Sequence, residues 1–471
     1  MIFSSYAFLL GFFPAVYLLF VVLRVWRLER AALAMIVVGS LVFYGMWSWR
    51  YLGLLLILIV VNFVLGKLQV RQRGRPQAKF WLTVAVAFNL CVLGYFKYAG
   101  FFFGFLPSAA SWHIILPLGI SFFTFQKIAW HVDLYQGRLK DTGSVLQYSF
   151  FVCFFPQLIA GPIVHARWLF PQIARGWLSR PLPWQLGLTL LTLGLVKKVL
   201  LADPLAPGVA TLFNTAQTGG ILSAPQVVLA GLSYGLQLYF DFSGYADMAI
   251  GLGLMFGIKL PANFRSPYKS ASIVEFWRRW HITLSSFLRD YLYIPLGGNR
   301  KGRLRANGNL LITMLLGGLW HGAGWQFILW GGIHGTLLVI NHYWRHLSNW
   351  RLPRPLAVAL TLLVVMLAWI PFRADSLTTS LHMFERLTDW RWEGTFDVAT
   401  LLTELAAMHI DKSLPVVCAA LLALALVAPT SRRLSLMLGP LGRGAFVAVG
   451  LFLVLKALAG APDRAFLYFN F

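Results

Sequence analysis

Long apolar runs recur from one end of the chain to the other, and they restrict the fold more than any other feature of the sequence. A run of about 18 or more residues with few charges is typical of a helix that crosses a membrane. Only 12% of the 471 residues are charged, whereas soluble domains carry about 25%. We therefore predict an all-α, polytopic membrane protein that forms one domain over residues 1–471, with about 11–13 transmembrane and re-entrant helices. The apolar runs cover residues 2–23, 31–47, 51–68, 80–105, 112–130, 184–201, 221–258, 356–370, 414–427 and 445–458.

The charge distribution indicates an orientation in the membrane. The net charge is +24, and the basic residues lie in short segments between apolar runs, which favours the positive-inside rule over nucleic-acid binding. Arg24, Arg27 and Arg30 follow the first run and no basic residue precedes it. This order predicts an uncleaved helix with its N-terminus in the periplasm. The basic excess can also attract anionic lipid or a phosphate-bearing donor.

Three segments depart from a simple spanning helix. Residues 146–163 contain Pro156, Gly161 and Pro162, which predicts a broken or re-entrant segment. Residues 221–258 exceed the length of one crossing, about 20 residues. The polar stretch 373–412 predicts a loop with short amphipathic helices, and it holds seven of the 16 acidic residues: Asp375, Glu385, Asp389, Glu393, Asp397, Glu404 and Asp411. The three cysteines have no metal-ligand spacing, so neither a metal site nor a disulfide is predicted.

A helix is predicted over residues 272–291. Ser272 and Glu275 fit a capping box at its start. Its many charges favour an interfacial or re-entrant position, with three aromatic residues at headgroup level: Trp277, Trp280 and Tyr291. His281 lies on its apolar stripe and is either a site residue or a hydrogen-bonded core histidine. Arg278, Arg279 and Arg289 are either headgroup anchors or ligands for donor phosphates.

The glycine-rich segment 294–309 is basic and predicted to be cytoplasmic. It is either a plain positive-inside loop or a phosphate-contacting loop. The candidate donor-binding residues are therefore Arg278, Arg279, Arg289, Asn299, Arg300 and Lys301.

His321 is the strongest candidate for chemistry from the residues alone. It lies in the apolar segment 310–330, and an ionisable group inside a membrane is a candidate functional residue because it is costly to bury. A desolvated imidazole is neutral, which suits a general base that deprotonates a hydroxyl attacking a thioester. A structural histidine is the alternative. His334 lies 13 positions further on, which is not the same helix face. Asp241 needs a buried partner, either an arginine or a histidine ring N–H.

Five motifs resemble the membrane-bound O-acyltransferases (MBOAT), and within them the AlgI-like polysaccharide O-acetyltransferases. They are LPLGISFFTFQ at 116–126, FFPQLIAGPIVH at 154–165, YFDFSGYADMAIG at 239–251, the segment 263–300 with WRRWH, and GLWHGAGWQFILWGGIHG at 318–335. The resemblance implies a many-helix fold around a funnel or tunnel, with a catalytic core at about 115–343. It implies His321 of the WHG motif as the catalytic residue and His281 as the second active-site residue, with Asp241, His334, Trp320 and Trp280 as supporting candidates.

The resemblance also implies a pathway. Acetyl is expected to come from a cytoplasmic donor, acetyl-CoA, with no bound cofactor. It would cross the bacterial inner membrane to a periplasmic SGNH-type acetyltransferase and the secretion machinery that modify an exopolysaccharide such as alginate or cellulose. Three alternatives stay open at this point: a D-alanyl transferase to a cell-wall polymer, a transporter such as a lipid-linked sugar flippase, and a non-enzymatic scaffold of a secretion complex.

Overall fold

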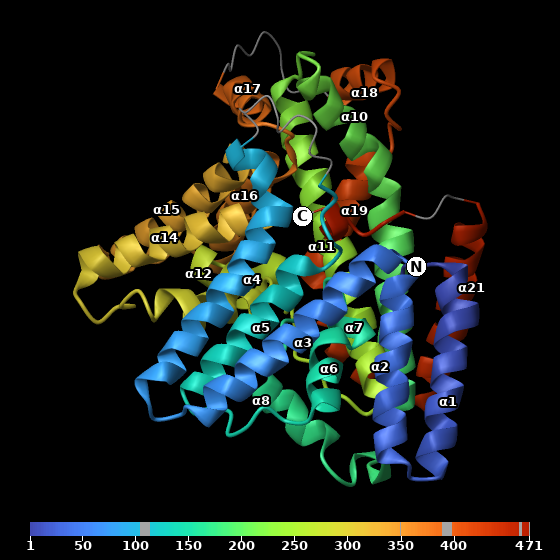
Figure 1. Ribbon diagram of the computed structural model, residues 1–471. Helices are drawn as coiled ribbons and strands as arrows, with labels where there is room; N and C mark the ends of the chain where they lie inside the picture. The colour runs from blue at the N-terminus through green and yellow to red at the C-terminus, as the bar shows by residue number, and fades with distance from the viewer. Residues whose placement is uncertain (104–113, 349, 389–397, 461–463, 471) are drawn as a thin grey trace. The chain divides into compact units, whose positions relative to one another are not determined.

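The computed structural model describes residues 1–103, 114–348, 350–388, 398–460 and 464–470, and all regular secondary structure in these ranges is helical (Figure 1). The predicted all-α class is therefore confirmed. Trp112, Asp389, Glu393 and Asp397 lie outside the described residues. By backbone contacts the chain divides into two compact units, one made of residues 1–196, 245–262 and 435–470, the other of 197–244 and 263–434.

The first unit contains most of the N-terminal helices. Its α6 begins with a complete capping box, because Ser144 Oγ accepts a hydrogen bond from Gln147 N and Gln147 Oε1 accepts one from Ser144 N. The helices of this unit are α1 (Phe13–Val25), α2 (Glu29–Gly45), α3 (Trp49–Arg71), α4 (Pro76–Phe103), α5 (Ile120–Tyr135), α6 (Val145–Cys153), α7 (Phe155–Leu158), α8 (Ala166–Leu169), α9 (Trp184–Leu195) and α21 (Pro440–Ala459). The break between α6 and α7 confirms the predicted interruption of residues 146–163.

A buried polar cluster joins α3, α4 and α5. The Oδ1 of Asn62 accepts a hydrogen bond from Asn89 Nδ2 at 2.5 Å and lies 3.1 Å from His131 Nε2. The other ring nitrogen of His131 lies 3.0 Å from Gln69 Oε1. Polar side chains that bond across helices hold apolar helices together where the surrounding medium offers no other partner. His131 therefore has a structural explanation within this unit.

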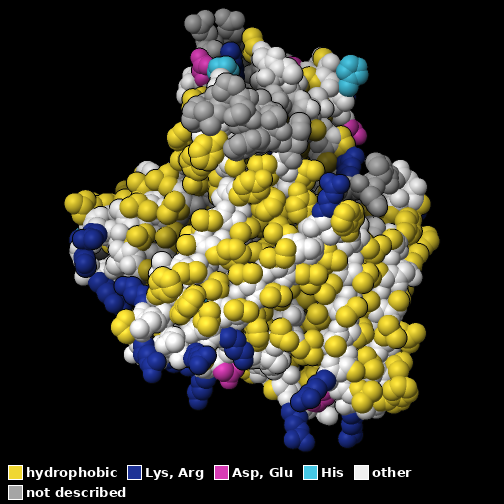
Figure 2. All heavy atoms as spheres, in the orientation of Figure 1, with side chains coloured by type: hydrophobic (Ala, Val, Ile, Leu, Met, Phe, Trp, Pro, Cys, Tyr) yellow, Lys and Arg dark blue, Asp and Glu magenta, His cyan; other side chains and the backbone are white. Residues whose placement is uncertain are grey.

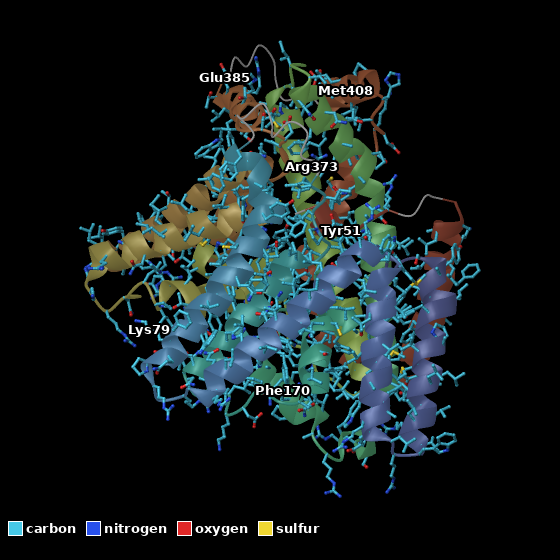
Figure 3. All side chains as sticks on the ribbon, in the orientation of Figure 1. Tyr51, Lys79, Phe170, Arg373, Glu385 and Met408 are labelled. Atoms are coloured by element: carbon cyan, nitrogen blue, oxygen red, sulfur yellow. The ribbon has the colours of Figure 1, made fainter. Side chains whose placement is uncertain are left out.

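The outer faces of α3 and α4 are suited to lipid. Figure 2 shows hydrophobic side chains over them and basic side chains at the end that carries their connecting turn. Tyr51 and Lys79 lie near opposite ends of this helix pair (Figure 3). Arg71 at the end of α3 and Arg73 and Arg75 in the turn are exposed, as expected for a helix end at a charged membrane surface. Which side of the membrane this is stays a prediction.

The second unit carries the motifs that predict chemistry. Its helices are α10 (Ala206–Gln217), α12 (Ile273–Arg279), α13 (Ile282–Leu288), α14 (Arg303–His321), α15 (Trp325–Leu347), α16 (Arg354–Arg373), α17 (Leu377–Thr388), α18 (Val398–Ala407) and α19 (Leu414–Val427). Two helices, α11 (Ala224–Met255) and α20 (Ser431–Met437), have residues in both units. The apolar run 221–258 thus forms a single 32-residue helix. The short helices α17 and α18 confirm the prediction for the polar stretch 373–412.

Only some of the predicted 11–13 transmembrane and re-entrant helices qualify as full membrane spans by length and hydropathy. Within the described residues, six helical segments are long and apolar enough to cross a membrane, or seven if the bent pair α19 and α20 forms one span. Helices such as α2, with 17 residues, and α5, with 16, fall just below that length. The molecule is a multi-pass membrane protein, in which many of the predicted 11–13 helices are too short or too interrupted to count as full spans.

The predicted helix 272–291 is interrupted, and this part of the prediction was wrong. The chain breaks at Trp280 and His281 into α12 and α13, because His281 adopts the left-handed conformation with φ 42° and ψ 53°. The predicted start is correct, since Ser272 Oγ accepts a hydrogen bond from Glu275 N. The Glu275 side chain accepts from Ala271 N rather than from Ser272 N, and it pairs with Arg279 at 2.6 Å.

Two glycines allow α14 and α15 to pack as a tight antiparallel hairpin (Figure 1). A Cβ atom added to Gly331 on α15 would overlap the carbonyl oxygen of Met314 on α14. A Cβ atom added to Gly318 on α14 would overlap the carbonyl oxygen of Phe327 on α15. The backbones therefore touch at both positions, and the glycines of this motif serve helix packing.

We expect Gly331→Ala to destabilise the protein by about 1–3 kcal/mol, because the added methyl group must push the two backbones apart. Gly332→Ala is the matched control, since its nearest heavy atom would be Leu315 Cδ2 at 3.6 Å. Both changes bring the same gain in helix propensity. Thermal unfolding in detergent should therefore give a lower Tm for Gly331→Ala alone, and equal values for the two variants would contradict tight packing of this hairpin.

Candidate active site

His281 is held at the break between α12 and α13 by a residue far from it in the sequence. Its side chain is fully buried, and its Nδ1 lies 3.2 Å from Asn263 Oδ1. The same oxygen accepts hydrogen bonds from Thr283 N at 3.2 Å and Thr283 Oγ1 at 2.9 Å. A non-glycine residue with positive φ is strained, and it persists only when its surroundings impose the conformation. Asn263 and Thr283 supply that restraint, which places the imidazole in a defined position.

The hydrogen bonds of Asn263 also determine the tautomer of His281. A backbone N–H such as that of Thr283 can only donate, so the atom that receives it is the amide oxygen. An amide oxygen can only accept, so His281 Nδ1 carries the proton that it donates. Nε2 is then the basic nitrogen of the ring. Burial lowers the pKa of His281 to about 3, which keeps this ring neutral.

His321 lies at the last position of α14, directly before the turn to α15. It was predicted within a continuous apolar segment, but the helix ends there and α15 begins at Trp325. The His321 ring is 3% exposed. Its ring centroid lies 4.8 Å from that of Trp320, 5.0 Å from that of Trp330 and 5.0 Å from that of Phe372. Aromatic rings thus enclose it on several sides.

Trp320 connects the two predicted catalytic residues. Its ring centroid lies 6.4 Å from that of His281 and 4.8 Å from that of His321. Since all three residues belong to the second unit, the structure brings together the two imidazoles that the sequence separates by 40 positions. Phe242 on α11 closes the other side of His281, with ring centroids 4.9 Å apart.

His334 joins the same cluster from α15, although its spacing from His321 indicated different faces of one helix. The two histidines lie on different helices of the hairpin, and Trp330 packs against both. Its ring centroid lies 5.0 Å from that of His321 and 4.8 Å from that of His334. His334 is fully buried, and neither ring nitrogen has a hydrogen-bond partner within the described residues. The Nε1 atoms of Trp277 and Trp330 are also buried without a described partner. Their rings lie 5.3 and 4.8 Å from that of His334.

Trp280 does not lie at headgroup level as predicted. It is 2% exposed and packs against Trp369 at 4.9 Å, Phe264 at 5.0 Å and Phe276 at 5.6 Å between ring centroids. The break at His281 turns this residue inward, because Trp280 leaves α12 in an extended conformation. Trp280 is therefore part of the apolar wall around the histidines.

Asp241 has a different partner from the two predicted. It is 1% exposed and pairs with Lys198 Nζ at 2.7 Å, and the same Nζ lies 2.8 Å from Asp203 Oδ1. A buried carboxylate needs an opposite charge, and here a lysine meets the requirement. Asp241 thus belongs to a charged triad in which Lys198 and Asp241 are buried and Asp203 is partly exposed, and its neighbour Phe242 is the residue that contacts His281.

The predicted donor-binding residues lie at the surface, apart from the histidine cluster. Arg279 pairs with Glu275 at 2.6 Å, and Arg289 pairs with Asp290 at 2.7 Å. The other four residues are exposed: Arg278, Asn299, Arg300 and Lys301. Within the described ranges, no group of three or more His, Cys, Asp or Glu side chains is placed to hold a metal ion.

The cluster of His281, His321 and His334 is suited to acid–base chemistry in a dry environment. Neutral imidazoles can accept a proton from a hydroxyl, and aromatic walls exclude the water that would hydrolyse a reactive ester. Sequence reasoning missed the wall residues Trp330, Trp369 and Phe372 and the positioning residue Asn263. It also missed Lys198, although a lysine inside an apolar run is a signal of the kind that identified His321.

Comparison with known proteins is consistent with this arrangement. A family model described as MBOAT, membrane-bound O-acyltransferase family, matches residues 41–372. The probable alginate O-acetylase AlgI of Azotobacter vinelandii is 43% identical over 83% of this chain and 79% of its own length. The peptidoglycan O-acetyltransferase of Helicobacter pylori is 40% identical over 82% and 79%. The probable alginate O-acetylase AlgI of Pseudomonas aeruginosa is 41% identical over 85% and 77%.

Removing the lysine of the buried triad should destabilise the fold. Lys198→Met leaves Asp241 buried without an opposite charge, which costs about 3–5 kcal/mol. The double variant Lys198→Met/Asp241→Leu should recover part of that loss, because the fully buried carboxylate is removed with the lysine, and the remaining Asp203 is partly exposed. The measurements are the yield of monodisperse protein and its Tm in detergent. If Asp241→Asn instead kept full stability and lost only acyl transfer, Asp241 would act on a catalytic group rather than on Lys198.

Proposed function

Because the chain belongs to the membrane-bound O-acyltransferase family, we propose that it transfers an acetyl group from a cytoplasmic thioester donor, acetyl-CoA, toward a cell-surface polysaccharide. The observation that carries this proposal is the buried contact of Trp320 with both His281 and His321. It places two imidazoles in one aromatic enclosure, as a hydroxyl-to-thioester transfer requires. The acetyl group would cross the inner membrane and reach the polymer with a periplasmic SGNH-type acetyltransferase and the secretion machinery.

His321 is the general base in this proposal. Its imidazole takes the proton from the acceptor hydroxyl while the hydroxyl oxygen bonds to the carbonyl carbon of the thioester. The carbon–sulfur bond then breaks, and the departing sulfur receives the proton from the imidazolium. The products are the O-acetyl ester and the free thiol. His281 orients the acceptor in this proposal: its basic Nε2 accepts a hydrogen bond from a second, neighbouring hydroxyl of the sugar, a role that its contact with Asn263 supports.

The similar proteins support a polysaccharide acceptor. Two of them are named for alginate and one for peptidoglycan, and both of these polymers carry sugar hydroxyl groups. We therefore extend the proposal to O-acetylation of a secreted or cell-wall polysaccharide. Acetyl-CoA is the proposed donor because its thioester is activated and its phosphates suit a basic cytoplasmic surface.

We expect His321→Ala to lower acetyl transfer by about 10²-fold or more, the contribution of a positioned general base. Acetyl incorporation into polymer, measured in membranes or reconstituted vesicles, is the assay. His342→Ala is the matched control, because His342 is an exposed residue of α15 and its loss should leave transfer unchanged. Retained acetylation in a folded His321→Ala variant would contradict the proposal.

The pH dependence tests the role of Asn263. In Asn263→Asp a carboxylate would face His281 Nδ1 and raise the pKa of the ring from its low value of about 3. Because only the neutral His281 ring can accept a hydrogen bond through Nε2, activity should begin to fall at a higher pH than in the wild type. Asn214→Asp adds the same charge at an exposed site on α10 and should leave the pH profile unchanged. An unshifted acid limb in folded Asn263→Asp would remove His281 from the mechanism.

A further inference from the structure

A cavity of about 850 Å³ lies where three helices of the second unit meet. Its walls come from the start of α12, the C-terminal half of α15 and the N-terminal half of α16. Cavities of this size hold ligands as large as a lipid headgroup with part of its chains. None of the six predicted donor-binding residues lines it.

One end of the cavity is strongly basic. Arg345, Arg351 and Arg354 line it, and no lining residue is acidic. Arg345 Nη2 donates to Ser272 Oγ at 3.3 Å, which ties α15 to the start of α12. Arg351 and Arg354 make no hydrogen bond or ion pair within the described part of the chain, although Arg354 lies near enough to Glu275 to help lower the pKa of that carboxyl. Two guanidinium groups are therefore available to a ligand oxyanion.

The cavity also contains a buried acceptor. Asn341 lines the cavity, and its Oδ1 is buried without a hydrogen-bond donor among the described residues. A buried polar atom without a partner is costly. A ligand that fits this site therefore carries a donor, such as a hydroxyl group, close to its negative charge.

The other walls are apolar and open outward. Ile340 on α15 is 56% exposed and Leu360 on α16 is 52% exposed, and Leu337 and Val364 continue the lining. Because α16 is long and apolar enough to cross a membrane, its exposed apolar side chains are suited to contact with lipid chains. Trp344 and Trp350, with ring centroids 6.0 Å apart, lie at the basic end, where a membrane helix places tryptophan at the headgroup level.

We propose that this cavity binds an anionic glycerophospholipid whose headgroup carries hydroxyl groups. Arg345, Arg351 and Arg354 hold its phosphate, and Asn341 Oδ1 accepts a hydrogen bond from a headgroup hydroxyl. Its acyl chains lie along the apolar walls of α15 and α16. This occupant matches every part of the cavity: the charge, the missing donor and the outward-facing apolar surface. A soluble nucleotide thioester would match only the arginines, since it would leave the exposed apolar walls uncovered.

The bound lipid would stabilise the three helices that surround the histidine cluster. At their other ends, α12 leads into His281, α15 carries Trp330 and His334, and α16 carries Trp369. A ligand that binds only the folded protein raises its stability by mass action. The lipid would therefore hold α12, α15 and α16 together at the membrane surface, and the same three helices also meet around the histidine cluster in the interior.

The test uses the full-length protein, delipidated in detergent. Phosphatidylglycerol is added and binding is measured by native mass spectrometry and by the rise in Tm, with phosphatidylcholine, soluble glycerol 3-phosphate and coenzyme A as comparison ligands. We expect phosphatidylglycerol alone to bind and to raise Tm. In Arg351→Gln/Arg354→Gln its affinity should fall by about tenfold or more, since two charge-assisted contacts are lost.

A matched variant controls for net charge. Arg71→Gln/Arg75→Gln removes the same two charges from the exposed turn between α3 and α4 and should change the affinity less than about twofold. Ala357→Trp, which fills the apolar wall and keeps every arginine, should also weaken phosphatidylglycerol binding. Equal binding of phosphatidylcholine and phosphatidylglycerol would overturn the proposal. So would unchanged affinity in the arginine variant, or competition by coenzyme A at the same arginines. Because binding is measured directly, the outcome does not depend on acetyl transfer.

Discussion

The three hydrogen bonds received by Asn263 Oδ1 are the interaction on which the proposed site depends. They come from His281 Nδ1, Thr283 N and Thr283 Oγ1. Together they hold His281 in the left-handed conformation, end α12 and start α13 in a new direction. Without this break, the apolar stripe of an uninterrupted helix would carry His281 as one more core side chain. The strained residue is instead fixed in one tautomer beside Trp320, which is the kind of local strain that clusters at functional sites.

In the second unit, the buried ion pairs of Lys198 and the histidine side chains have different surroundings. The full charges of Asp203 and Asp241 share the cation of Lys198, whereas the imidazoles lie among aromatic rings. A carboxylate beside His281 would stabilise the imidazolium and weaken a neutral acceptor. An amide oxygen orients the ring without adding charge. The choice of Asn263 as the partner of His281 therefore preserves the neutral ring, whose Nε2 can accept a hydrogen bond. The charge of Asp241 on α11 is paired with Lys198 instead.

The sequence predicts the parts of this structure that depend on local composition. The apolar run 414–427 coincides with α19, and the start of α12 follows its capping residue, because hydropathy and capping act within a few positions. The break at His281 could not be predicted in this way, since its restraint comes from Asn263, 18 positions earlier. The partner of Asp241 is 43 positions away. Trp330 joins His321 to His334 only because the α14–α15 hairpin folds back, so the family resemblance identified the histidines while their surroundings required tertiary structure.

The same three helices connect the membrane surface to the proposed site, and this geometry limits how each can move. At one end, Arg345 binds the N-cap of α12 and lies in the basic part of the cavity. At the other, Trp277 of α12, Trp330 of α15 and Trp369 of α16 lie around His334. A displacement of α15 that widened the cavity would also shift Trp330 against His321 and against His334. Since packed interiors transmit strain, we expect a ligand in the cavity to influence the spacing of the imidazoles through these three helices.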